Sequence, residues 1–267
     1  MNAAVFLHLG LSAYTVATIG YLGWLIRPSG PPARVGLIAL SVGYGFHACA
    51  VAIKTVALFT DPGARFTFTW GMSVLAFLVV GGFLLAGKRY RLPVIGAFVA
   101  PLVLAIVVPA HLVPALHGRM QVEGVILPFH IAVALAGVAM FALGCGVAVM
   151  YLILERQLKE KRLGALFRRL PSLQLLDTLN QKFVVLGFAF LSLTIVTGAF
   201  FAHLEAGPLF ALEPKQAFSL LAWALVAGVL FLRQTTGWRG RKVALATMAS
   251  FALMVFAYVG IFARGAA

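Results

Sequence analysis

The sequence predicts an all-α polytopic integral membrane protein with eight transmembrane helices and both termini on the outer, periplasmic side. Two observations predict this fold class: the apolar composition and the one-sided distribution of the basic residues. Of the 267 residues, 62% are hydrophobic and 10% are charged, and the mean hydropathy is +1.02. Soluble domains usually carry about 25% charged residues. We expect residues 1–267 to form a single transmembrane domain.

Eight stretches of the chain are long and apolar enough to span a membrane, because a helix needs roughly 20 mostly apolar residues to cross about 30 Å of hydrocarbon. In order, they cover about 3–26, 35–59, 66–86, 92–113, 126–154, 182–203, 214–234 and 243–263. The first stretch has no basic residue before it and is followed by Arg27 and Arg34. We therefore expect a retained first span with its N-terminus outside, rather than a cleaved signal peptide.

The basic residues fix the expected orientation. With eight spans, sixteen of the 21 Lys and Arg residues fall in or beside connections on one side, at 27–34, 88–91, 155–182 and 233–242. Cytoplasmic connections carry the excess of Lys and Arg, so both termini are expected outside. This distribution explains the net charge of +14 without a nucleic-acid partner.

The connection between the fifth and sixth spans is expected to form a surface helix. Leu163, Leu166, Phe167 and Leu170 have the i, i+3, i+4, i+7 spacing of one helical face. Such a helix lies on the cytoplasmic membrane surface with its arginines toward anionic headgroups, and Pro171 would end it. Docking of a cytoplasmic partner is the alternative for this segment.

The histidines are concentrated toward the outer side. His47 lies near the membrane midplane, and the other five lie in the outer portion: His8, His111, His117, His130 and His203. Neutral imidazole is the commonest metal ligand, and heme iron takes one or two axial side chains, often histidine. On the outer side, Lys54, Arg65, Arg119 and Lys215 are candidates to pair with heme propionates. His47 and Lys54 are seven residues apart and share a helical face, although snorkelling to the headgroups also explains Lys54.

The sequence lacks the motifs of several functional classes. No span contains a buried Asp or Glu, which argues against proton pumps and ion-coupled transporters. The sequence has no P-loop, no HExxH and no recognisable nucleophile setting, so we expect no enzyme activity and no metal other than heme iron. Cys49 and Cys145 lie at different depths, so no disulfide is expected between them.

The second half of the chain resembles cytochrome c assembly proteins of the CcsA and CcmC type. The resemblance rests on "LPSLQLLDTLNQKFVVLGFAFLSLTIVTGAFFA", "EPKQAFSLLAWAL", "GWRGRKV", "FAYVGIF" and "LPFHIAVALAGVAMFAL". It covers about 126–263 well and the first four spans more loosely. It implies that His130 is an outer-face heme-ligand candidate. It also implies a role in cytochrome c biogenesis.

The chain departs from that family pattern in three places. "HLEAGPLFALEPK" replaces a tryptophan-rich WWD segment, and "FLRQTTGW" and "FARGAA" stand where the family has histidines. These departures resemble the shorter HemX and YpjD-like branch, whose members lie in the bacterial inner membrane and have a histidine such as His47 of "GFHACA" in the second span.

The sequence therefore predicts a protein that binds heme b noncovalently at the outer face and holds, transfers or regulates it during cytochrome c biogenesis. His130 and His203 are the axial candidates at a shared predicted depth, and His47 is a deeper one. The expected partners are heme, the bilayer, and other maturation proteins or an apocytochrome. Two alternatives stay open: a small-molecule or metal-ion transporter, and a structural subunit of a membrane redox complex.

Overall fold

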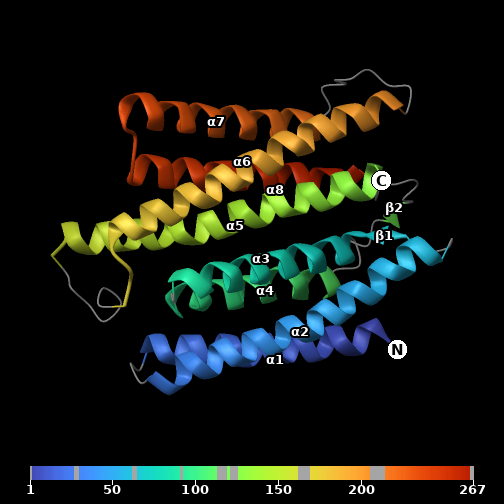
Figure 1. The fold of residues 1–267 in the computed structure, drawn as a ribbon, viewed down its shortest axis with the longest axis horizontal. Helices are drawn as coiled ribbons and strands as arrows, with labels where there is room; N and C mark the ends of the chain where they lie inside the picture. The colour runs from blue at the N-terminus through green and yellow to red at the C-terminus, as the bar shows by residue number, and fades with distance from the viewer. Residues whose placement is uncertain are drawn as a thin grey trace. The chain divides into compact units, whose positions relative to one another are not determined.

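The computed structural model of the protein describes residues 2–26, 30–61, 65–90, 93–112, 119–120, 126–161, 169–204 and 214–264. Within these residues the chain forms eight α-helices and one pair of short strands (Figure 1). In chain order they are α1 (Ala3–Ile26), α2 (Gly30–Thr60), β1 (Phe66–Thr67), α3 (Phe68–Tyr90), α4 (Pro93–Leu112), β2 (Arg119–Met120), α5 (Ile126–Lys159), α6 (Leu173–Leu204), α7 (Pro214–Thr236) and α8 (Arg241–Arg264).

These helices confirm the all-α membrane fold that the sequence predicts. Each of α1 to α7 contains a stretch long and apolar enough to cross a membrane, and α8, with 24 residues, has the length of a span. The strands were not predicted from the sequence. They pair antiparallel, with Phe66 opposite Met120 and Thr67 opposite Arg119.

The chain divides into two compact units, Met1–Val122 and Glu123–Ala267. The first contains α1 to α4 with both strands, and the second contains α5 to α8. Each unit is described by itself below. The grouping of the whole chain into one transmembrane domain stays a prediction.

In the first unit, small residues let large aromatic side chains enter between the helices. α1 packs along α2 and against α4, and α3 packs against α4. Tyr14 and Tyr21 of α1 are fully buried. A Cβ atom added at Gly43 of α2 would lie 2.8 Å from the Tyr14 ring, and one added at Gly36 would lie 3.0 Å from the Tyr21 ring. Close helix approach at small residues is the usual packing of membrane helices, because lipid supplies no hydrophobic drive for association.

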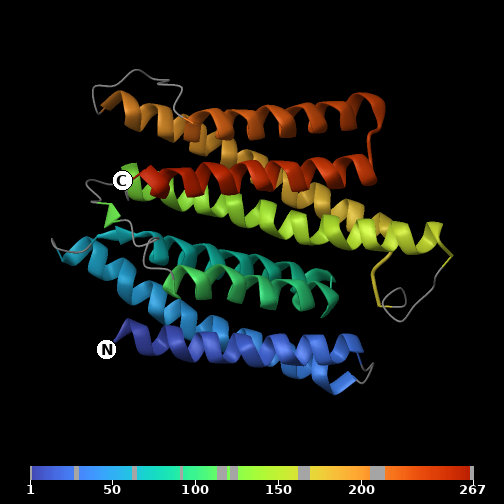
Figure 2. The same ribbon diagram turned by 180° about the vertical axis from the view of Figure 1, so that it is seen from behind.

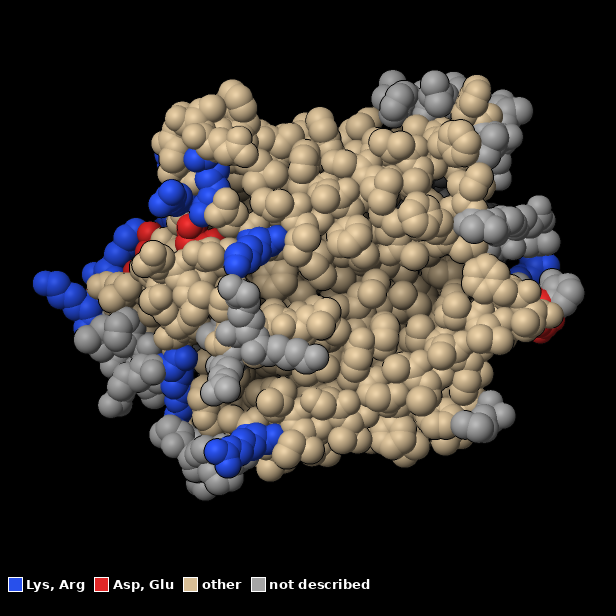
Figure 3. All heavy atoms as spheres, in the orientation of Figure 1, with Lys and Arg blue, Asp and Glu red and all other residues tan. Residues whose placement is uncertain are grey.

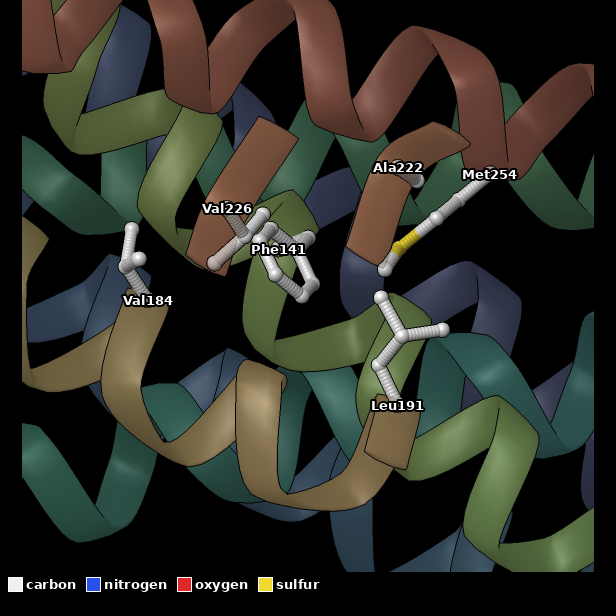
Figure 4. Close-up of a cluster of buried hydrophobic side chains, with 6 residues drawn as sticks. All are labelled: Phe141, Val184, Leu191, Ala222, Val226 and Met254. Atoms are coloured by element: carbon white, nitrogen blue, oxygen red, sulfur yellow. The ribbon is translucent and has the colours of Figure 1, made fainter. Parts of the chain in front are cut away.

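In the second unit, α5 pairs with α6, and α8 packs against both α5 and α7, as the two opposite views show (Figures 1 and 2). All four helices contribute to one buried cluster (Figure 4): Phe141, Val184, Leu191, Ala222, Val226 and Met254. Phe141 lies so close to α6 that a Cβ atom at Gly187 would come within 2.6 Å of its ring. Glycine at that position therefore sets the distance between α5 and α6.

One ionic contact ties three elements together in the second unit. Arg233 of α7 donates from both terminal nitrogens to the carboxylate of Asp177 in α6, at 3.1 and 2.6 Å. The side chains are only 9% and 15% exposed. The backbone N–H of Gly240, in the turn between α7 and α8, donates to the same carboxylate at 3.0 Å. This carboxylate thus holds the α7–α8 turn against the start of α6.

α5 and α6 are longer than the apolar stretches that predict them. With 32 residues, α6 is about 48 Å long, so it exceeds the hydrocarbon thickness by about 18 Å. Most of the predicted surface helix, 162–168, lies outside the described residues. The described residues before Pro171, Arg169 and Leu170, form a turn and a bend rather than a helix. At the polar end of α5, two i,i+4 ion pairs, Arg156 with Glu160 and Lys159 with Glu155, support the helix.

The exposed basic side chains of the second unit lie where α5 ends, where α6 begins and at the α7–α8 turn. Figure 3 shows these cations, in blue, at that end of α5 to α8, with few charges along the middle of the helices. The exposed residues are Arg156, Lys159, Lys161, Lys182, Arg239, Arg241 and Lys242. This matches the segregation of charge that the sequence shows.

Candidate functional site

His130 lies in the second turn of α5 and faces α6. Pro128, in the first turn, suits that position because the first helical N–H groups have no intrahelical partner. The His130 side chain is half-buried. Its Nδ1 lies 2.9 Å from Oγ1 of Thr197 in α6. The ring is therefore anchored by one nitrogen to the neighbouring helix.

Gly198 provides the space for this ring. A Cβ atom added at Gly198 would lie 3.0 Å from Cε1 of His130, which is closer than side chains normally approach. The adjacent pair of Thr197 and Gly198 thus supplies both a hydrogen-bonding partner and room for the imidazole. Analysis of the sequence missed both residues, although the "TGAFFA" run that carries the resemblance begins at Thr197.

His203 lies near the C-terminal end of α6, and its side chain is exposed. It is six residues beyond Thr197, which is about 9 Å along the helix axis and about 240° around it. Because His130 is level with Thr197, an iron atom bound by both imidazoles would have to lie between these two levels.

His47 belongs to the first unit and is completely buried. Its Nδ1 lies 3.2 Å from the hydroxyl of Tyr14 in α1, and its Nε2 lies 2.8 Å from the hydroxyl of Ser73 in α3. The ring also makes an edge contact with Phe77, with centroids 5.8 Å apart. Both ring nitrogens are engaged inside the unit, so iron ligation by His47 requires the loss of one of these bonds.

The candidate cations occupy both units. Lys54 is half-buried in α2, two turns beyond His47, and Arg65 is exposed just before β1. The backbone of Arg119 is held in β2, opposite Thr67 of β1. Lys215 is the second residue of α7 in the second unit.

Heme needs one or two axial ligands and, at its edge, partners for two carboxylates. In the second unit, the half-buried imidazole of His130, anchored through Nδ1, has the chemistry of an axial ligand. The candidate cations have the charge that pairs with carboxylates, and they are divided between the two units.

Comparison with known proteins confirms the resemblance over most of the chain. A family model described as "Cytochrome C assembly protein" matches residues 38–263. A "Cytochrome c biogenesis protein CcsA" from Prochlorococcus marinus subsp. pastoris is 27% identical over 221 residues, which are 70% of this chain and 68% of that protein. The protein of the same name from Chlamydomonas reinhardtii is 31% identical over 150 residues, covering 56% of this chain and 40% of the relative.

A solved structure named "Cytochrome c Heme Lyase CcmF" has the same fold. The two superpose with a TM-score of 0.70 at 14% sequence identity, over 99% of this chain and 49% of the other. The chain thus spans about half the length of the solved structure and less than half of the Chlamydomonas relative.

Proposed function

The chain belongs to the cytochrome c assembly protein family, and from that premise we propose that it binds heme b noncovalently and holds, transfers or regulates it during cytochrome c biogenesis. The observation that carries the proposal is the setting of His130. This histidine lies within the matched residues, near the end of a span, with its ring anchored to α6 by Thr197. An imidazole oriented in this way is suited to bind an axial position of heme iron.

The other residues have supporting roles in this proposal. His203 is the second axial candidate in the same unit. His47 is the secondary one, because a bond from Tyr14 or Ser73 must first be released. Lys54, Arg119 and Lys215 are proposed to neutralise the propionates. Bound heme would supply an iron centre, and the chain would orient it and exclude water from one face.

We propose that this protein lies in a bacterial inner membrane with both termini in the periplasm. The exposed cations of α5 to α8 gather at the end of the second unit opposite the C-terminal end of α8, and an even number of spans puts the N-terminus on the same side as the C-terminus. Heme would then be held at the outer side. An apocytochrome or another maturation protein is the proposed partner there.

The biological role is tested by removing the protein from a host that makes c-type cytochromes. We expect heme-stained c-type cytochromes to fall in its absence, to return with the wild-type chain, and not to return with His130→Ala. His8→Ala, which changes an exposed histidine of α1, is the matched control and should restore them. Unchanged cytochrome levels in the absence of the protein would contradict the proposed role.

A second assay separates heme holding from catalysis. We propose that the chain holds heme without attaching it. Purified protein mixed with heme and a reduced peptide containing CxxCH should give no thioether product by mass spectrometry, even though it binds heme. Formation of the thioether adduct at a rate above that of free heme would show lyase activity instead.

A further inference from the structure

The geometry points to Thr197 as a positioning residue: we infer that its hydroxyl fixes the His130 tautomer with the proton on Nδ1 and the lone pair on Nε2. This inference deepens the proposed function, since it concerns the same histidine. It rests on contacts within the second unit and holds for the protein without heme.

The hydrogen bonds around Thr197 show which group donates and which accepts in its contact with His130. Its Oγ1 lies 2.8 Å from the carbonyl oxygen of Leu193, 3.2 Å from that of Thr194 and 2.9 Å from Nδ1 of His130. A hydroxyl has one proton, and carbonyl oxygens only accept. The hydroxyl proton therefore points to its own helix, in the back-bonded arrangement common for threonine. Toward His130 the oxygen can only accept, so Nδ1–H is the donor.

A neutral imidazole protonated at Nδ1 carries its lone pair on Nε2. Metal-binding histidines commonly have this tautomer. One ring N–H donates to an acceptor, which fixes the tautomer and raises the basicity of the nitrogen that binds the metal. Here the acceptor is the Thr197 hydroxyl, which donates its own proton to a backbone carbonyl oxygen of α6. Gly198 allows the ring to approach that acceptor, since a Cβ atom there would lie 3.0 Å from Cε1.

The direct test is nitrogen NMR of the full-length heme-free protein, labelled with 15N-histidine in lipid nanodiscs, with His130 assigned by comparison with His130→Ala. We expect a protonated Nδ1 and an unprotonated Nε2 in wild type and in Thr197→Ser, which keeps the hydroxyl. Thr197→Val keeps the shape but removes the acceptor, and should lose the Nδ1–H preference. A cooperative thermal unfolding transition of each full-length variant shows that it is folded.

Two results would overturn the inference: a wild-type His130 protonated at Nε2, or a Thr197→Val variant with the wild-type tautomer. Heme binding and the reduction potential of the bound heme are then measured in the same variants. Thr197→Val should lower heme affinity by about 10-fold, the low end of outer-shell effects, and change the reduction potential, whereas Thr197→Ser should not. If the wild-type chain binds no heme, the proposed function fails, and the NMR result still decides the tautomer.

Discussion

At the residue scale, the structure distinguishes three histidines that look alike in the sequence. His130 is half-buried and anchored to Thr197, His203 is exposed, and His47 is buried between two hydroxyls. Their positions along the helices could be predicted from the spans: His47 in the middle of α2, His130 near the start of α5 and His203 near the end of α6. The hydrogen-bonding partners of these histidines could not be predicted. Thr197, Tyr14 and Ser73 are ordinary span residues, and the direction in which each side chain points depends on how the helices rotate and pair.

The space beside His130 gives the first prediction. Gly198→Ala should push the imidazole off Thr197 and weaken heme binding by about 10-fold or more, because a Cβ atom there lies 3.0 Å from Cε1. Gly146→Ala in α5 is the matched control, since a Cβ atom there meets nothing within 4 Å. Titration with hemin, followed by absorbance, measures both. Equal affinities for the two variants would refute the steric argument.

The burial of His47 gives the second prediction. His47→Leu leaves the hydroxyls of Tyr14 and Ser73 without their partner, and each unsatisfied buried group costs about 1–3 kcal/mol. We expect a clear loss of stability in detergent micelles, measured by thermal unfolding. Tyr14→Phe removes only the longer bond, of 3.2 Å, and should cost less. A His47→Leu protein as stable as wild type would exclude a structural role for this network.

At the element scale, the apolar stretches predict the helices but not where they end. α6 begins at Leu173, nine residues before the predicted span, where the Ser172 hydroxyl caps the helix by accepting from the Leu175 N–H at 3.3 Å. In its second turn, Asp177 is held by Arg233 and Gly240. Hydropathy cannot show that contact, which joins residues more than fifty positions apart. The paired strands at Phe66 and Met120 were missed because each has only two residues.

The α7–α8 turn gives the third prediction. Gly237 and Gly240 both have positive φ, 71° and 68°, so alanine at either position costs about 1 kcal/mol or more in backbone strain. A Cβ atom at Gly240 would also lie 2.5 Å from the hydroxyl of Tyr151, whereas at Gly237 it meets nothing within 4 Å. Gly240→Ala should therefore lower the unfolding temperature more than Gly237→Ala. The reverse order would contradict the packing described for this turn.

At the scale of the whole molecule, composition and charge predict the class of protein, and most of the chain matches one family. The resemblance in the sequence is close over about 126–263 and looser over the first four spans, and the family match begins at residue 38. The division into two compact units could not be predicted. Apolar spans give no signal about which helices pair, since every span is apolar on most faces.

The orientation gives the fourth prediction. In a Cys49→Ser, Cys145→Ser background, single cysteines at two exposed positions, Asn2→Cys and Lys161→Cys, are treated with a membrane-impermeant maleimide. Asn2→Cys should be labelled in intact spheroplasts, and Lys161→Cys only after permeabilisation, because cytoplasmic connections carry the basic excess. Labelling in the opposite pattern would invert the proposed topology and move the His130 end of α5 to the cytoplasmic side.

Heme binding through His130 is measured by the Soret absorbance of protein purified from heme-replete membranes. We expect a Soret band from acid-extractable heme b in wild type and in His8→Ala, and its loss, or a more than about 10-fold lower heme affinity, in His130→Ala. No Soret band in wild type, or a wild-type spectrum and affinity in His130→Ala, would contradict heme binding through His130.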